Sequence, residues 1–339
     1  MVCAATSPMD ASSTPASPSR CQRRAAQSCP GPLCASQSPI PTGADTVINY
    51  EMTAFTDKKV TFTAPAAPGS NIVRAGEDVR KGEVLLRRGQ VIDAGAAGTL
   101  AAQGVANPRV YRVPRVAVLS TGSELVEAEA DPGPGQIRNS NALTLSAALK
   151  RMGCEPVYLG IAPDSAEGIA ALLERGLSGC DAVVSTGGVS VGDYDLTPDA
   201  MERIGAEILF RGVDLKPGMA CAYAVKDGKL LCGLSGNPAS SLTNFYMLAL
   251  PALRALCGLA EPVPPEITLT LADAFPKGSY GTRILRGTLD MRDGTARLRL
   301  PKSQGNAVIS SAVGCDALAV VPAGSGPLEA GTKLKGFLI

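Results

Sequence analysis

The sequence predicts an α/β protein in which a doubly wound αβα domain lies between two β-rich regions. Residues 115–258 alternate apolar strand patterns with amphipathic helix patterns, which is typical of a parallel sheet with helices on both faces. Residues 263–339 contain only short strand patterns separated by turn signals. The chain has 339 residues, and a single core tends to split above ~250–300 residues, so we expect several domains.

The N-terminal third divides at a change of composition. Residues 1–38 have no helical or strand period and no aromatic residue, and we expect them to be disordered or foreign to the fold. Residues 39–114 are expected to form a β-rich domain. Its elements would be strands in 46–55 and 59–65, short glycine-punctuated strands in 73–92, and a helix over 93–104 that ends at Gly104.

The αβα domain has clear start and stop signals. Asp164 and Glu167 have the spacing of a capping box, and Thr197 with Pro198 marks the start of another helix. Asp227-Gly228 predicts the turn of a hairpin. The expected strands are 115–120, 155–161, 181–187, 206–213 and the hairpin 220–234, and the expected helices are 139–153, 164–176, 196–205 and a long one over 238–258.

The C-terminal region, 263–339, is expected to be a small β-barrel or sandwich. Its strand patterns alternate apolar and polar residues, and Asp293-Gly294 marks one of the turns between them. The expected strands lie within 266–273, 282–301, 317–324 and 332–339.

Charge and hydropathy exclude several classes of protein. The formal net charge is +1 and aromatic residues are only 4%, so neither a basic field nor stacking platforms point to a nucleic acid. No run approaches the ~18–20 apolar residues of a membrane span, and no apolar segment resembles a signal peptide. We therefore expect a cytoplasmic protein that binds neither nucleic acid nor membrane.

The supply of reactive side chains restricts the chemistry. The chain has no histidine, which removes the commonest general base and zinc ligand. None of the ten cysteines forms a CxxC pair, and those in apolar contexts, such as Cys180, Cys232 and Cys257, are expected to be buried free thiols. Catalysis would then depend on carboxylates, Lys, Ser or Thr, backbone amides or a hard cation.

Ligands of doubly wound sheets bind outside the carboxyl ends of the strands, so the loops at those ends are the candidate site. These loops are rich in glycine, small polar residues and acids. The candidate residues in them are Thr121, Gly122, Glu124, Asp164, Gly187, Gly188, Ser190, Gly192, Asp193, Asp195, Ser235, Gly236, Asn237 and Pro238.

The mixture of glycines and acids suggests one kind of ligand. Glycine turns and helix N-termini favour phosphate, whereas a carboxylate beside a phosphate repels it by roughly 4 kcal/mol at 4 Å and an effective dielectric near 20. A bridging cation reverses that sign, and Mg²⁺ typically combines one or two carboxylates with substrate phosphates. The loop 187–195 therefore predicts a site for phosphate and Mg²⁺.

Simpler interpretations exist for each residue. Glycine turns follow strands in any α/β fold, Asp164 could be only a helix cap, and Asp193 or Asp195 only a solvated turn residue. Lys216 could be a surface lysine before a turn. The convergence of these loops at one edge of one sheet favours the functional interpretation.

Several segments in this order resemble a known family. They are "PTGADTVI", "RAGEDVRKGEVLLRRG", "STGSEL", "GQIRNSN", "STGGVSVGDYD", "LKPG" and "GLSGNPASS", and the resemblance runs from about residue 39 to the C-terminus. The chain is similar to the molybdopterin molybdenumtransferases of the MoeA and gephyrin E-domain type. The resemblance implies a homodimer with the active site between subunits, which cleaves adenylylated molybdopterin with Mg²⁺, joins molybdate to the dithiolene and releases AMP.

The resemblance also implies roles for individual residues. Acidic positions of the family pocket match Glu124, Asp164 and Asp195, and Asp78 matches one that the N-terminal half supplies. Lys216 matches the lysine of the family's KPG stretch, where a cation suits molybdate or phosphate. The resemblance places the pterin phosphate on the glycine loops and Mg²⁺ on Glu124, Asp193 and Asp195. It also implies contact with the molybdopterin adenylyltransferase and with molybdoenzyme maturation proteins.

The chain departs from the family pattern at three places. Ser235 stands where the family has the first proline of LPGNP, and Met219 or Ala220 stands where a second lysine often follows KPG. Before Pro39 the family's "MDGYA" and "TGAP" stretches are replaced, with only Met9-Asp10 retained. A frameshifted or mis-started reading frame would produce that jump, and we expect this rather than a new functional tail.

Three functions therefore compete at this point. A Mg²⁺-dependent molybdenumtransferase is the leading one. The alternative is a non-catalytic molybdopterin-binding or scaffold protein that has lost the N-terminal part of the site. The third is a molybdopterin adenylyltransferase, which shares the αβα fold but would not need the flanking β regions. A dinucleotide dehydrogenase is excluded, because it would need a GxGxxG motif after a strand and the chain has none.

Overall fold

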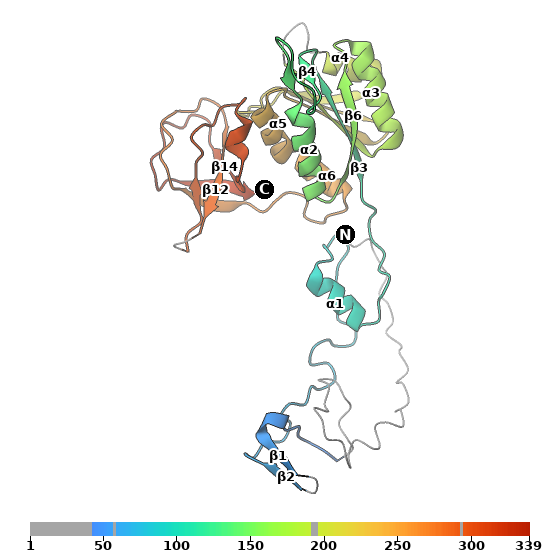
Figure 1. The fold of residues 1–339 in the computed structure, drawn as a ribbon, viewed down its shortest axis with the longest axis vertical. Helices are drawn as coiled ribbons and strands as arrows, with labels where there is room; N and C mark the ends of the chain where they lie inside the picture. Colours follow the sequence, from blue (N-terminus) through green and yellow to red (C-terminus); the bar gives the residue numbers. More distant parts are fainter. Residues whose placement is uncertain (1–42, 57–58, 191–195, 292–293) are drawn as a thin grey trace. The chain divides into compact units, whose positions relative to one another are not determined.

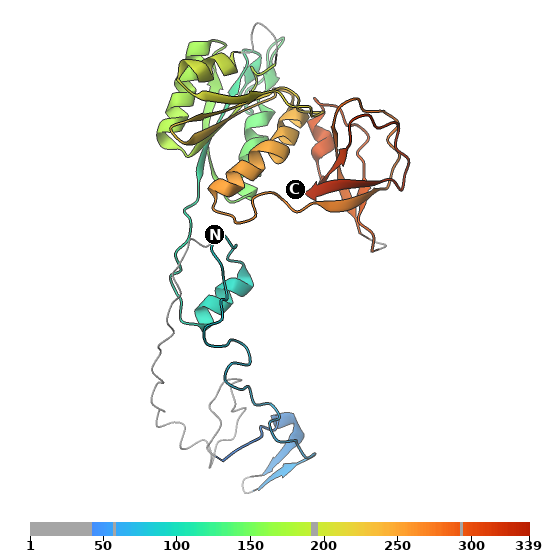
Figure 2. The ribbon, with the colours of Figure 1, turned by 180° about the vertical axis from the view of Figure 1, so that it is seen from behind.

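The computed structural model describes residues 43–56, 59–190, 196–291 and 294–339. The chain divides into two compact units near residue 86. Figures 1 and 2 show the elements of both from opposite sides. No helix among these residues is long and apolar enough to cross a membrane.

The N-terminal unit contains the two predicted strands as a short hairpin. A 3₁₀ turn, Tyr50–Met52, precedes β1 (Thr53–Thr56), which pairs antiparallel with β2 (Lys59–Phe62). These strands confirm the patterns in 46–55 and 59–65, although they are shorter than predicted.

The glycine-punctuated strands predicted in 73–92 are wrong, because this segment forms turns. Three four-residue turns begin at Arg74, Arg80 and Arg87, and in each the amide of the fourth residue donates to the carbonyl of the first. The fourth residue, a Glu or Gln, also accepts from the amide of that arginine through its side chain. The third residue is a glycine with positive φ each time, a conformation that favours a turn over a strand.

The sheet of the αβα domain has six strands in the order β6-β3-β7-β10-β9-β8. Four neighbouring strands are parallel, and the β9–β10 hairpin turns at Asp227-Gly228, both of which have positive φ as predicted. The strands are β3 (Arg115–Thr121), β6 (Glu155–Ala162), β7 (Ala182–Thr186), β8 (Glu207–Arg211), β9 (Cys221–Lys226) and β10 (Lys229–Leu234). A small ladder joins β4 (Leu125–Val126) to β5 (Ile137–Arg138).

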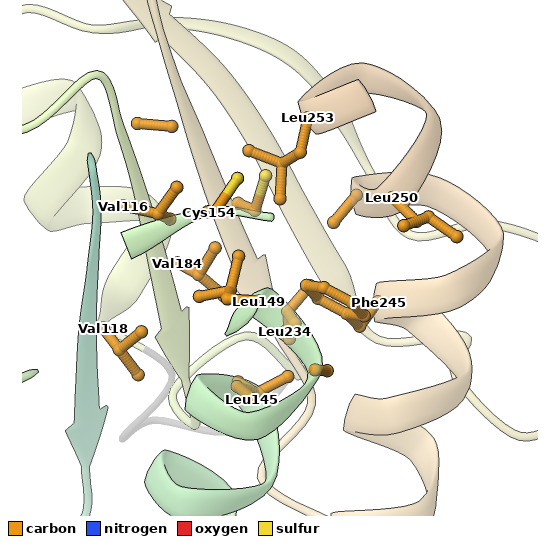
Figure 3. Packing of buried hydrophobic residues seen from close by; sticks show 14 of the residues in the cluster. Val116, Val118, Leu145, Leu149, Cys154, Val184, Leu234, Phe245, Leu250 and Leu253 are labelled. Carbon is orange, nitrogen blue, oxygen red and sulfur yellow. The ribbon is translucent and has the colours of Figure 1, made fainter. Parts of the chain in front are cut away.

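Helices cover both faces of this sheet, which confirms the doubly wound prediction (Figure 1). On one face, α2 (Ser140–Arg151), α5 (Pro238–Asn244) and α6 (Leu250–Leu256) pack on β3, β7 and β10. Figure 3 shows the side chains of this core between α2 and the α5–α6 segment. On the other face lie α3 (Ala166–Gly179) and α4 (Thr197–Arg203). Before the sheet, α1 (Ala94–Ala102) starts at Asp93 and is followed by Gly104 at positive φ, as predicted.

Three helix predictions need correction. Ser165, not Asp164, caps α3, because its side chain accepts from the amide of Gly168. Thr197 is the first residue of α4 rather than its cap, and its hydroxyl donates to the carbonyl of Gly187. The long helix 238–258 is interrupted by a π-helical segment, Phe245–Ala249, two residues before Pro251, which has no N–H for the regular hydrogen-bond ladder.

The C-terminal region is a closed five-stranded barrel in the order β11-β13-β12-β14-β15, which settles the barrel-or-sandwich alternative. Its strands are β11 (Ile267–Leu271), β12 (Arg283–Asp290), β13 (Arg297–Arg299), β14 (Ala317–Val321) and β15 (Lys333–Leu338), with a 3₁₀ turn at Ile309–Ala312. Leucines, alanines and Val321 from the strands fill its interior.

Cysteines in the described residues confirm the free-thiol prediction. All six are free, and five of them are buried. The Sγ atoms of Cys154 and Cys257 lie 3.6 Å apart in the core between α2 and α6. Burial raises the pKa of the Cys232 thiol.

The end of β7 lies very close to the end of β3. Gly187 has φ +93°, and a Cβ on it would lie 2.6 Å from both the carbonyl oxygen and Oγ1 of Thr121. The amide of Gly187 also donates to the carbonyl of Leu234 at the end of β10. Only glycine fits both the positive φ and the short distance to Thr121. Through these contacts, the turn after β7 joins the ends of β3 and β10.

Gly187→Ala is expected to lower the free energy of unfolding by roughly 2–4 kcal/mol, because the methyl group meets Thr121 as well as an unfavourable φ. Gly153 is the matched control, since its φ is +89° and a Cβ there has no atom within 4 Å. Gly153→Ala should cost about 1 kcal/mol. Urea unfolding measures both, and equal losses would contradict the close packing of Gly187.

A bidentate ion pair lies where the strands β3 and β7 of the αβα domain begin. The guanidinium of Arg112 donates to both carboxylate oxygens of Asp181, and the amide of Arg115 donates to the same carboxylate over 2.8 Å. The Asp181 side chain is only 16% exposed. The hydrogen bond from Arg112 is the largest cause that lowers the pKa of Asp181 below its ordinary value.

Asp181→Asn is therefore expected to lower Tm at neutral pH by about 2–4 °C. A lowered folded-state pKa stabilises the protein above the unfolded-state pKa, and this contribution is lost as the pH falls through the folded-state value. The difference in Tm should then be full at pH 7 and shrink below about pH 4. Thermal unfolding across pH tests this, with Glu155→Gln, which loses a solvent-exposed pair with Arg115, as the control.

Candidate active site

The candidate site lies at the carboxyl edge of the parallel strands. The loops that leave β3, β6, β7 and β10 all start at this edge, because these four strands run in the same direction. The structure therefore brings together most of the predicted loop residues from 121–124, 163–165, 187–190 and 235–237.

Two carboxylates border the turn after β3. Oδ2 of Asp164 accepts from the amide of Ser123 over 2.7 Å, so the loop after β6 holds the loop after β3. The carboxylate of Glu124 folds back over Gly122, where a Cβ would lie 2.6 Å from its Oε2. Asp164 thus contacts a neighbouring loop instead of capping α3, and both acids remain solvent-exposed.

Glycine turns form the adjoining part of the site. A Cβ on Gly188 would lie 2.7 Å from Oγ1 of Thr197, and one on Gly236 would lie 3.5 Å from Cα of Gly187. The buried side chain of Asn141, on α2, donates to the carbonyl of Gly236 over 2.8 Å. A ligand could approach the backbone closely here, because no side chains project from these turns.

A cleft of about 1200 Å³ opens beside these turns, between the αβα domain and the rim of the barrel. Ser190, Ser235, Asn237 and Lys216 are the predicted residues that line it. Pro238 begins α5 directly behind them.

The lining of the cleft is mainly cationic. Two acids, Asp199 and Asp273, lie among five cationic side chains, which are Arg211, Lys216, Lys277, Arg283 and Lys302. Of these, Arg211 pairs with Glu202 over 2.7 Å. The remaining balance of charge favours an anionic ligand.

The barrel fixes the backbone of Lys216. Its amide donates to the carbonyl of Thr282 and its carbonyl accepts from the amide of Ile284, each over 2.9 Å. The next peptide bond, to Pro217, is cis. The Lys216 side chain is exposed and lines the cleft.

A buried arginine lies behind the barrel side of the cleft. The guanidinium of Arg286 donates to Oγ of Ser311 and to the carbonyl of Gly305, a cleft residue, and its Nη1 has no partner among the described residues. Burial lowers the pKa of this guanidinium.

Sequence reasoning missed the basic residues that the barrel contributes. The rule that ligands bind at strand ends directs attention to the αβα loops and contains nothing about a neighbouring barrel. Arg283 and Lys302 also sit in ordinary strand or turn patterns. The signal in the sequence that could have indicated these cleft residues is the number of basic residues in 277–302.

Some predicted residues are not placed in this site. Gly192, Asp193 and Asp195 lie outside the described residues. Asp78 belongs to the N-terminal unit.

The predicted Mg²⁺ site can be tested against the donors present. Within the described ranges, no three acidic or cysteine side chains gather around one point. Glu124 and Asp164, however, border the same turn, and Mg²⁺ needs only one or two carboxylates when phosphates supply other oxygens. The donor chemistry therefore fits Mg²⁺ bound together with a phosphate ligand.

Comparisons with known proteins agree with this architecture. The model of the MoeA N-terminal region (domains I and II) matches residues 20–104, so its match begins before the motifs that resume near Pro39. The model of a probable molybdopterin binding domain matches 117–255, and that of the MoeA C-terminal region (domain IV) matches 268–336.

Among curated relatives, a molybdopterin molybdenumtransferase of Staphylococcus aureus is 34% identical over 292 residues, which is 86% of this chain and 70% of that protein. One of Staphylococcus epidermidis is 36% identical over 293 residues, with the same two coverages. The crystal structure of the molybdopterin biosynthesis protein MoeA of Pyrococcus horikoshii superposes with a TM-score of 0.69 at 29% identity, covering 87% of this chain and 72% of that one. The chain therefore belongs to the molybdopterin molybdenumtransferase (MoeA) family.

Proposed function

We propose that this chain is a transferase that inserts molybdate into adenylylated molybdopterin and releases AMP, in the last step of molybdenum cofactor synthesis. The single observation behind this proposal is that a cationic cleft continues into glycine turns bordered by two carboxylates. A substrate that carries a pyrophosphate and a reaction that takes up an oxyanion need these two environments side by side.

The glycine turns would bind the phosphates of the substrate. Gly236 is exposed and Gly188 is half-buried at the strand ends, and neither carries a side chain that would cover the backbone, whereas Gly187 is buried and holds the turn together. Thr121 and Ser235 add hydroxyl groups at the same edge. These groups are uncharged donors, so they can hold a phosphate without requiring a buried cation.

The carboxylates would hold Mg²⁺ against that phosphate. Glu124 and Asp164 are the described candidates, and Asp193 and Asp195 would complete the set. Bound there, Mg²⁺ would neutralise charge on the pyrophosphate as AMP leaves. Asp164 has a second role, because its contact with Ser123 holds the turn in place.

Lys216 would attract the oxyanion. It lies among the cationic residues of the cleft, and its backbone is held by two hydrogen bonds from the barrel strand β12 and the residue before it. Molybdate is a small dianion, so an exposed ammonium group attracts it electrostatically, and a fixed backbone keeps that group at the cleft.

We also propose that the protein works as a cytoplasmic homodimer whose partner subunit supplies Asp78 to the pocket. The resemblance to the family supports this arrangement, which would make the N-terminal unit part of the site. A molybdopterin adenylyltransferase would supply the substrate, and molybdoenzyme maturation proteins would receive the product.

The first test is AMP release from adenylylated molybdopterin by the purified chain with Mg²⁺, with and without molybdate. Molybdate-dependent release is expected. Tight substrate binding without release would instead support a non-catalytic molybdopterin-binding or scaffold protein.

Lys216→Ala is expected to raise the KM for molybdate by roughly tenfold or more, because one charge-assisted contact is lost. Lys216→Arg should recover part of the affinity since it keeps the charge. Lys333→Ala, in β15 and outside the lining of the cleft, is the control. An unchanged KM in Lys216→Ala would remove this residue from oxyanion binding.

Two substitutions of Asp164 separate its charge from its loop contact. Asp164→Asn keeps an acceptor for the amide of Ser123, whereas Asp164→Ala removes both the acceptor and the charge. If the carboxylate binds Mg²⁺, both variants should need roughly tenfold more Mg²⁺ for half-maximal AMP release. Normal Mg²⁺ dependence in Asp164→Asn, with a defect only in Asp164→Ala, would leave Asp164 a purely structural role.

A further inference from the structure

A buried asparagine contacts the loop that carries Lys216. Asn244 is the last residue of α5 and is fully buried at 0% exposure. Its Nδ2 donates to the carbonyl of Gly218, two residues after Lys216. The contact joins a core helix of the αβα domain to the wall of the cleft.

Gly218 is shaped for this contact. Its φ is +109°, and a Cβ there would lie 2.7 Å from Nδ2 of Asn244 and 3.4 Å from the carbonyl oxygen of Ser240. The loop therefore presses its backbone directly against α5, which only glycine permits.

The Lys216 loop is thus held from two sides. The barrel binds the amide and carbonyl of Lys216 through Thr282 and Ile284, and α5 binds the carbonyl of Gly218 through Asn244. Without the hydrogen bond from Asn244, the backbone after Lys216 would no longer be held to the αβα domain at Gly218.

The same helix also reaches the other walls of the cleft. Ser240 of α5 lines it, and the amides of Ala239 and Ser240 donate to the carbonyl of Asn306 from the barrel loop. Asn244 therefore couples the Lys216 loop to a helix that also holds the cleft residue Asn306 of the barrel region.

Stability alone does not explain an asparagine at this position. Oδ1 of Asn244 is buried and has no partner in the described part of the chain. A buried polar atom without a partner is costly, and an apolar side chain of similar volume would remove that atom, but it would also remove the hydrogen bond to the carbonyl of Gly218. The hydrogen bond to Gly218 is the polar contact that this side chain does make in the described part of the chain.

We propose that Asn244 is a positioning residue for oxyanion binding, which holds the 216–218 loop so that the Lys216 ammonium group faces the cleft. This inference rests on the proposed function, in which Lys216 binds molybdate.

The test uses the full chain with Asn244→Leu, which removes the amide at similar volume. Thr243→Val is the matched control, because Thr243 is a buried neighbour on α5 whose hydroxyl donates to the carbonyl of Ala239. Molybdate binding is measured by calorimetry, alone and in the Lys216→Ala background. Hydrogen exchange of the amides in 215–220 is measured without ligand.

We expect Asn244→Leu to weaken molybdate binding by about tenfold and to speed exchange in 215–220, with a small loss of Tm because the carbonyl of Gly218 loses its donor. In the Lys216→Ala background it should cause no further loss of affinity, since it acts through Lys216. Thr243→Val should change neither affinity nor exchange. Unchanged affinity in Asn244→Leu, or a loss that adds fully to that of Lys216→Ala, would overturn the proposal.

A second variant allows the same test if Asn244→Leu does not fold. Gly218→Ala disturbs the same contact from the loop side and should give the same loss of affinity, again only when Lys216 is present. If the unchanged chain binds no molybdate, the oxyanion role fails together with the proposed function. Hydrogen exchange then still decides whether Asn244 holds the loop.

Discussion

The close approach of the β7 turn to the end of β3 is the constraint on which the site depends. Gly187 lies against Thr121 with no room for a Cβ, and its amide is bonded to the end of β10. Three loops therefore share one small region at the carboxyl edge of the sheet. The contact of Asp164 with the β3 turn adds to this arrangement.

The chemistry of the site follows from two neighbouring electrostatic environments. The glycine turns and the two carboxylates form one, which suits a phosphate together with a hard cation. The cleft at the barrel forms the other, and its cationic lining suits an oxyanion. Because the cleft lies between the αβα domain and the barrel, neither domain alone would provide both environments.

Buried amides connect these environments to the core. Asn141 on α2 holds the carbonyl of Gly236, and Asn244 on α5 holds that of Gly218. Each glycine lies in a loop of the site, and each asparagine also has a buried Oδ1 without a partner among the described residues. The helices that fill the core of Figure 3 thereby set the backbone of the loops as well.

The αβα order, the hairpin at Asp227-Gly228, the C-terminal β region and most loops of the site could be predicted from the sequence, because hydrophobic periodicity and glycine positions are local signals. Sequence reasoning misassigned 73–92, where the glycine-punctuated segments were predicted as short strands but form local turns instead. Only the tertiary structure decided that Asp164 contacts Ser123, that the barrel fixes Lys216 and that Asn244 reaches Gly218. Those partners are 26 or more residues apart in sequence or belong to another domain, and no local pattern specifies which distant groups will meet.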